Sequence, residues 1–83
     1  MKVRYFAWVR ERVGKTDEEI EPPSSVATVS DLIAWLTKRG EGYAYAFENP
    51  KVIRAAIDKT HGRAKTKIAG AGEIAFFPPM TGG

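Results

Sequence analysis

The residues most able to do chemistry stand at the end of the chain, in the run PPMTGG from Pro78 to Gly83. A terminal carboxylate has a pKa of about 3.3–3.7 and is ionised at neutral pH. An ionised carboxylate is a poor acyl donor until an enzyme activates it. Attack of this carboxylate on the α-phosphate of ATP would give a mixed anhydride, which a sulfur or nitrogen nucleophile could displace. Gly83 is therefore a candidate reactive group, reached through Met80, Thr81 and Gly82.

The residues before the terminus suit its delivery to another protein. Pro78 and Pro79 cannot donate to a sheet ladder and hold the chain extended, so they end a strand and direct the tail away from the body. Four more residues reach about 13–14 Å, and glycines without a Cβ can thread a narrow channel. We therefore expect a folded domain over residues 1–77 and a flexible tail over residues 78–83. A Gly-Gly end also occurs at frayed termini, so the dipeptide alone does not decide the chemistry.

Rare and missing residue types exclude other kinds of site. The sequence has no cysteine, which excludes disulfides, thiolate metal sites and cysteine nucleophiles. One histidine, His61, cannot build a multi-histidine metal centre, so no metal site is predicted. The net charge of +3 is too small to indicate nucleic-acid binding. No nucleophile–base pair is visible, and an independent enzyme is the least favoured interpretation.

Two segments near the ends of the chain have the alternation of half-buried strands. Val3 and Tyr5 share one side of residues 2–7, and Ile74 and Phe76 share one side of residues 73–77. Between them the patterns predict a short helical turn over 8–14, a charged edge strand over 16–21, a strand over 52–57, and a hairpin or loop over 59–67. Residues 43–47 alternate aromatic residues with alanine, which suits a short strand or a helical turn, and we favour the turn.

The main helix is predicted over residues 29–39. Its apolar side chains fall at helical spacing, at Val29, Leu32, Ile33 and Leu36. Thr28 and Asp31 have the spacing of a capping box, and Lys38 and Arg39 would complement the dipole at the carboxyl end before Gly40.

The order of these elements describes one α+β domain, a mixed sheet with one main helix packed on one face. No apolar run approaches the length of a membrane span, and the start of the chain lacks a signal-peptide pattern. We therefore expect a cytoplasmic protein that does not bind membranes.

The face of the sheet opposite the helix would carry two phenylalanines. Phe6 and Phe77 would merge into one patch if the first and last strands are neighbours, and such a patch could bind a partner. The alternative is that one ring folds beneath a flanking loop. The basic stretch 59–67 is open in the same way, because it could be a solvated loop or a patch for phosphate or an acidic partner.

Taken together, these residues resemble the small-subunit family of molybdopterin synthase, sulfur carriers with the ubiquitin-like β-grasp fold. The ending GEIAFFPPMTGG is similar to the family's last strand, double proline and Gly-Gly, with Met80 where valine is usual. The opening KVRYFAWVRERVG is similar to the family's first strand and Arg-Glu-x-x-Gly turn, here Arg10, Glu11 and Gly14. The run THGRAK departs from the pattern, since the family more often has an apolar residue where His61 stands.

The resemblance implies a cycle in which no cofactor is bound and ATP is used by a partner. An adenylating enzyme of the ubiquitin-activating type would adenylate Gly83, and sulfur would replace the adenylate to give a thiocarboxylate. Pro78, Pro79, Met80, Thr81 and Gly82 would lie in a channel of the large synthase subunit, within a heterotetramer. The thiocarboxylate would there supply sulfur to cyclic pyranopterin monophosphate. The residues that match family positions at the partner interface are Phe6, Arg10 and Phe77.

Two other functions remain open at this point. The nearer rival is a β-grasp sulfur carrier for thiamine, cysteine or tRNA thiolation, with the same terminal chemistry and a different acceptor. The more distant rival is a non-catalytic RNA-binding module that uses residues 59–67. Base stacking requires interleaved aromatic side chains, and this stretch has none.

Overall fold

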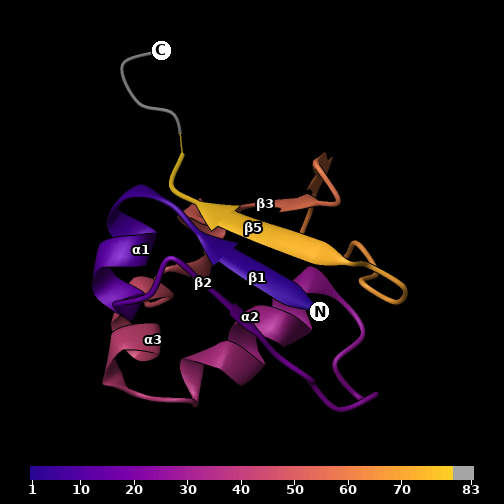
Figure 1. The fold of residues 1–83 in the computed structure, drawn as a ribbon, viewed down its shortest axis with the longest axis horizontal. Coiled ribbons are helices and arrows are strands. Elements are labelled where there is room, and N and C mark those ends of the chain that lie inside the picture. The colour runs from indigo at the N-terminus through magenta and orange to yellow at the C-terminus, as the bar shows by residue number, and fades with distance from the viewer. Residues whose placement is uncertain (80–83) are drawn as a thin grey trace.

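The computed structural model of the protein describes residues 1–79 as a five-stranded sheet with helices packed against it (Figure 1). Its elements in chain order are β1 (Lys2–Tyr5), α1 (Ala7–Val13), β2 (Asp17–Glu19), α2 (Val29–Thr37), α3 (Glu41–Ala46), the 3-10 helix η1 (Pro50–Val52), β3 (Arg54–Ile57), β4 (Thr60–Gly62) and β5 (Glu73–Phe77). The strands lie side by side in the order β2-β1-β5-β3-β4. The predicted α+β class is confirmed.

The sheet is mixed, and the first and last strands are its central neighbours. β1 pairs with β5 in parallel, with Val3 opposite Ile74 and Tyr5 opposite Phe76. The other three pairings are antiparallel: β1 with β2, β3 with β5, and β3 with β4. The basic stretch after β3 contains a hairpin, one of the two predicted alternatives, and β2 lies at the sheet edge as predicted.

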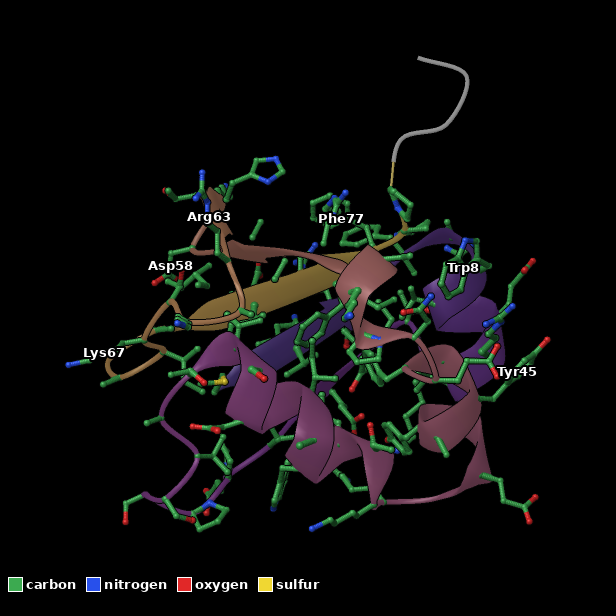
Figure 2. All side chains as sticks on the ribbon, turned by 180° about the vertical axis from the view of Figure 1, so that it is seen from behind. Trp8, Tyr45, Asp58, Arg63, Lys67 and Phe77 are labelled. Atoms are coloured by element: carbon green, nitrogen blue, oxygen red, sulfur yellow. The ribbon has the colours of Figure 1, made fainter. Side chains whose placement is uncertain are left out.

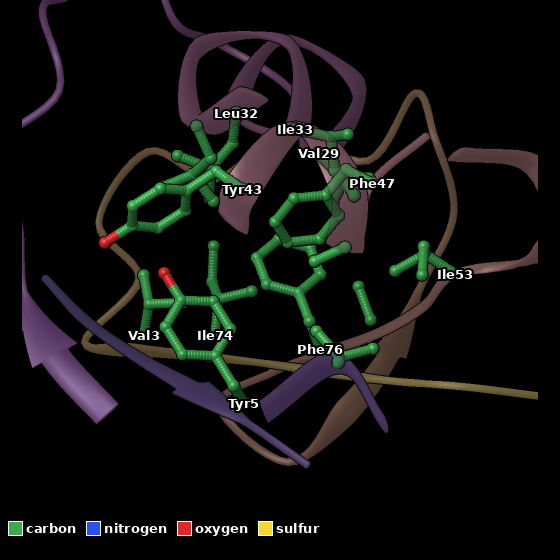
Figure 3. Close-up of a cluster of buried hydrophobic side chains, with 14 of the residues drawn as sticks. Val3, Tyr5, Val29, Leu32, Ile33, Tyr43, Phe47, Ile53, Ile74 and Phe76 are labelled. Carbon is green, nitrogen blue, oxygen red and sulfur yellow. The ribbon is translucent and has the colours of Figure 1, made fainter. Parts of the chain in front are cut away.

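The core lies between one face of the sheet and α2 (Figure 3). Val3, Tyr5, Ile74 and Phe76 are fully buried, as the alternation of both strands predicts. Four buried side chains of α2 belong to the same core, and they are the predicted apolar positions Val29, Leu32, Ile33 and Leu36. Burial of these aliphatic and aromatic side chains is the main favourable free energy of the fold.

The predicted capping box at the start of α2 is present. The Thr28 hydroxyl accepts a hydrogen bond from the Asp31 amide at 3.2 Å, and the Asp31 carboxylate accepts one from the Thr28 amide at 3.2 Å. The helix was predicted to end at Arg39, but α2 ends two residues earlier, at Thr37, and Lys38 is its C-cap. The Arg39 guanidinium instead reaches Glu18, 3.3 Å away.

Residues 43–47 belong to a helix and its C-cap, so the preferred helical turn is confirmed over the strand, and it is part of a longer helix. α3 spans Glu41–Ala46, and its buried positions are Tyr43 and Ala46, followed by Phe47. These residues are three and four apart, which places them on one face of a helix. The alternation of aromatic residues with alanine obscured this spacing because exposed Tyr45 has the same apolar character as its buried neighbours.

Among residues 1–79, no helix combines the length and the apolar composition that crossing a membrane requires.

Candidate functional site

The candidate site begins where β5 ends. β5 runs from Glu73 to Phe77, and Pro78 and Pro79 follow it directly, both half-buried. The parallel β1 ends beside it, and the Phe6 amide donates to the Phe76 carbonyl at 3.0 Å. The last described residues of the chain therefore leave from the centre of the sheet, between β1 and β3.

Phe6 and Phe77 each follow one member of the last β1–β5 pair, Tyr5 opposite Phe76; Phe6 is the N-cap of α1, and Phe77 is the last residue of β5. Phe6 is 42% exposed. Phe77 is half-buried, because the imidazole of His61 packs edge-on against its ring at a centroid distance of 5.7 Å. Of the two alternatives for this face, exposure describes Phe6, whereas Phe77 is partly covered by the hairpin.

Arg10 lies one helical turn after Phe6 on α1. Its amide donates to the Phe6 carbonyl at 3.3 Å, and its side chain is exposed. No ion pair within residues 1–79 involves Arg10. The left-handed Gly14, with φ of 85°, ends this helix and donates its amide to the Arg10 carbonyl at 2.8 Å. The structure thus places Phe6 and Phe77 beside the end of β5, where Pro78 follows, and Arg10 one helical turn after Phe6.

Four predicted site residues, Met80, Thr81, Gly82 and Gly83, lie outside the described residues. The flexibility predicted for the tail, its channel role and the reactivity of Gly83 therefore stay predictions.

A cluster on α1 and α3 was missed by the sequence reasoning (Figure 2). The guanidinium of Arg12 lies 4.4 Å from the ring centroid of Trp8 and 3.9 Å from that of Tyr45. It also pairs with Glu48 at 3.4 Å. The spacing of Trp8 and Arg12 on one helix face was a usable signal, but their contact with Tyr45 depends on how α1 packs against α3.

A second missed residue is Glu18, the middle residue of β2, which lies opposite Val3 in the β1–β2 register. Its carboxylate accepts hydrogen bonds from the Tyr43 hydroxyl at 2.6 Å and the Tyr5 hydroxyl at 2.8 Å. Lys15 and Arg39 pair with the same carboxylate, each at 3.3 Å. The side chain is 11% exposed.

The pKa values around Glu18 follow from these contacts. Burial by itself would raise the pKa of the Glu18 carboxyl, but hydrogen bonds from Tyr43, Tyr5 and Lys15 outweigh it and hold the pKa below its ordinary value. Burial and the hydrogen bond to Glu18 raise the pKa of Tyr5 and of Tyr43. The cluster is ionised at Glu18 and neutral at both tyrosines at pH 7, which is an arrangement for stability rather than for proton transfer.

Within residues 1–79, no three His, Cys, Asp or Glu side chains come together as metal ligands would. Arg10 on α1 is exposed, and exposed Arg54 lies opposite Phe77 in the β3–β5 register. Such cations can bind an anionic surface, but they supply no nucleophile to a terminal carboxylate.

Comparison with known proteins places the whole chain in one family. The model of the ThiS family matches residues 3–83. The chain belongs to the ThiS family. Two curated relatives match the chain over all of its 83 residues and over 99% of their own length. Both are called molybdopterin synthase sulfur carrier subunit; the one from Haemophilus influenzae is 34% identical and the one from Escherichia coli is 35% identical.

Two solved structures with a similar fold superpose on this chain. A molybdopterin converting factor subunit 1 from Pyrococcus furiosus superposes with a TM-score of 0.74 at 27% identity, covering 95% of each chain. The small archaeal modifier protein 1 of Haloferax volcanii superposes with a TM-score of 0.72 at 22% identity, over 96% of this chain and 97% of that one. The chain has the ubiquitin-like β-grasp fold, and the predicted fold is confirmed.

Proposed function

We propose that this protein is a sulfur carrier in molybdenum cofactor biosynthesis and acts in the cytoplasm as the small subunit of molybdopterin synthase. Its role is to bring one sulfur atom on its C-terminus into the active site of a larger subunit. The chain contributes the sulfur and the docking surface, and the partner proteins contribute the catalytic groups.

The observation that carries the proposal is the match along the whole chain to two curated sulfur carrier subunits, at 34% and 35% identity. Both matches run to the end of the chain, where Met80 and Thr81 separate the double proline from Gly82 and Gly83. The position of Pro78 at the end of a central strand adds support, because a tail that starts there has a rigid base.

The chemistry follows from the properties of a glycine carboxylate. An oxygen of the Gly83 carboxylate attacks the α-phosphate of ATP in the activating enzyme, and pyrophosphate leaves. Sulfide displaces AMP and gives the thiocarboxylate directly. A persulfide donor instead displaces AMP to give an acyl disulfide, and a thiol then attacks its outer sulfur, which releases the thiocarboxylate and leaves a disulfide on the donor. In the large subunit this sulfur passes to cyclic pyranopterin monophosphate, and Gly83 returns as a carboxylate. Two loaded carriers supply the two sulfur atoms of the dithiolene.

The same C-terminus has to be bound by two partners in turn, the adenylating enzyme and the large subunit, the latter within a heterotetramer. Phe6, Arg10 and Phe77 surround the base of the tail, and we assign them to this shared interface. An exposed aromatic ring beside an arginine is the composition that interface centres favour.

The direct test is intact mass spectrometry of the full chain after incubation with ATP, a sulfur donor and the activating enzyme. We expect one oxygen to be replaced by one sulfur, in the fragment that contains Gly83. The chain without Gly82 and Gly83 is the control; it should melt at the wild-type temperature and gain no sulfur. Normal molybdopterin formation with this shortened chain would contradict the proposal. Sulfur loading without transfer to the pterin would instead assign the carrier to thiamine, cysteine or tRNA thiolation.

The interface is tested with Phe77→Ala, measured by calorimetry against the large subunit. Because Phe77 lies on the outer face of β5, the variant should bind more weakly and lose less stability than the about 3–5 kcal/mol typical of a core Phe→Ala change. Tyr45→Ala is the matched control, since Tyr45 is a 53% exposed aromatic residue on α3. Equal affinities for the two variants would remove Phe77 from the interface.

A further inference from the structure

A groove of about 580 Å³ lies beside the candidate site, between α2, η1 and the β3–β4 hairpin. Its floor is aliphatic and includes Val29, Ile33 and Ile53. Four basic side chains surround this floor, and they are Lys51, Arg54, His61 and Arg63. Within residues 1–79, no carboxylate lines the groove, which is apolar at the bottom and basic at the rim.

The charge of this region differs in sign from that of the rest of the chain. Residues 51–67 carry six lysines and arginines and one carboxylate, a net charge of +5, whereas the remaining residues together carry −2. The one carboxylate, Asp58, accepts hydrogen bonds from the amides of Gly72 and Glu73 at 3.1 and 3.0 Å and does not line the groove. Within residues 1–79, none of the six cations takes part in an ion pair.

The groove adjoins the base of the tail. Arg54 is paired with Phe77 in the β3–β5 register, and the His61 ring packs on the Phe77 ring at 5.7 Å. Figure 2 labels Phe77 and Arg63 on the same side of the molecule. A protein that holds the tail at Pro78 therefore has part of its surface next to the groove.

We propose that this groove binds an acidic segment of the partner protein that receives the tail, with short aliphatic side chains among its carboxylates. The identity of that partner rests on the proposed function, and the chemistry of the segment rests on the groove. The aliphatic side chains pack on Val29, Ile33 and Ile53. Carboxylates pair with Arg54 and Arg63, whose planar guanidinium groups bind carboxylates through two parallel hydrogen bonds.

A protein segment fits these observations better than RNA does. Residues 50–67 contain no Phe, Tyr or Trp, and the one aromatic side chain among the described groove residues, His61, already packs against the Phe77 ring. A cationic rim without internal partners also accelerates the encounter with an acidic protein surface.

Two triple variants with the same change of net charge separate specific binding from general attraction. The groove variant is Lys51→Glu, Arg54→Glu and Arg63→Glu. The control variant is Lys59→Glu, Lys65→Glu and Lys67→Glu, whose side chains lie in the same basic segment but do not line the groove. Both are made in the full chain, and their melting curves are compared with the wild type to show that they fold.

Calorimetry with the large synthase subunit at about 0.15 M salt is the first measurement. We expect the groove variant to lose more than about tenfold in affinity and the control variant less than about threefold. Equal losses, or wild-type affinity in the groove variant, would overturn the proposal.

Amide chemical shifts of the isotope-labelled carrier give a second, independent measurement. The probe is a synthetic peptide of sequence Asp-Glu-Val-Asp-Ile-Glu, and the competitor is a single-stranded uridine oligonucleotide. Shifts should concentrate in residues 29–33, 51–55 and 61–64, and the groove variant should abolish them. Stronger binding of the oligonucleotide than of the peptide, reduced equally in both variants, would replace the acidic segment with RNA and end the proposal.

The outcomes also separate this inference from the proposed function. Normal sulfur loading at Gly83 together with wild-type affinity of the groove variant would end the groove proposal and leave the carrier function intact. If the wild type gains no sulfur, the carrier function fails, and the peptide titration still decides whether the groove takes an acidic segment.

Discussion

The two edges of the sheet use charge in opposite ways. At the β2 edge, the carboxylate of Glu18 is 11% exposed and has four partners, which are Tyr5, Tyr43, Lys15 and Arg39. At the β3–β4 edge, the cations of residues 51–67 are exposed and form no ion pair within residues 1–79. The paired charge at the β2 edge stabilises the fold, whereas the exposed cations at the β3–β4 edge can bind another molecule.

The difference follows from where each side chain points. Glu18 is opposite Val3 in the β1–β2 register, and Val3 faces the core. A carboxylate placed there loses water and requires hydrogen bonds in exchange, which the two tyrosine hydroxyls and two cations provide. Arg54 and Arg63 keep their hydration, so nothing in the folding of the chain requires them to find a partner.

The largest effect is expected from Glu18→Ala. The substitution leaves the hydroxyls of Tyr5 and Tyr43 without their acceptor and removes the partner of Lys15 and Arg39. Removing one member of such a network costs about 3 kcal/mol, measured as the free energy of unfolding in urea. Glu19→Ala is the matched control, since the Glu19 side chain is 75% exposed on the same strand and should change stability little. Equal losses of unfolding free energy for the two variants would show that the hydrogen bonds of Glu18 do not stabilise the fold.

A smaller loss is expected from Tyr43→Phe. It deletes the 2.6 Å hydrogen bond to the Glu18 carboxylate and keeps the ring in the core. A hydrogen bond to a charged group contributes about 1.5–3 kcal/mol, and we expect the lower end because Tyr5 and the cations remain. Tyr45→Phe, at an exposed position on the same helix, should unfold with the wild-type midpoint. A wild-type midpoint for Tyr43→Phe as well would mean that the hydroxyl contributes nothing.

Acidification should weaken the β2 edge. The pKa of Glu18 is lower in the folded protein than its ordinary value of 4.5, so the unfolded chain binds the proton more tightly. The stabilisation from Glu18 is therefore complete above about pH 4.5 and is lost as the pH falls through the lower folded pKa. Melting temperatures of the wild type and Glu18→Gln, compared from neutral pH down to strong acid, should converge at the acid end. A constant difference over this range would exclude Glu18 as the titrating group.

The smallest effects are expected at the basic edge. Lys51→Ala, Arg54→Ala and Arg63→Ala should each change the free energy of unfolding by no more than about 0.5 kcal/mol, because these side chains are exposed and make no ion pair within residues 1–79. Removing a cation from a segment of net charge +5 also relieves repulsion, so a slight increase in the free energy of unfolding fits the same explanation. A loss of more than about 1 kcal/mol in urea unfolding would assign that side chain a structural role.

Local patterns were sufficient for much of the fold. The alternation in β1 and β5, the helical spacing in α2 and the Thr28–Asp31 box each depend on residues within a few positions of one another. Such signals survive in a single sequence because backbone geometry sets their period. α3 was assigned as a turn because its period is masked by an exposed tyrosine, and only its packing against α1 and α2 distinguishes the faces.

The sequence by itself determined the class of the fold, the strand that precedes the tail and the double proline that follows it, because steric preference and hydrophobic period act along the chain. It also contained the family resemblance from which Phe6, Arg10 and Phe77 were predicted to bind the partner proteins. Only the tertiary structure decided which charges are paired and which are free. The partners of Glu18 come from β1, α3 and the loops near residues 15 and 39, and the groove is assembled from α2, η1 and the β3–β4 hairpin. Apart from Lys15, the partners of Glu18 are distant from it in sequence, and such contacts depend on how the sheet and helices pack, which residue types alone do not specify.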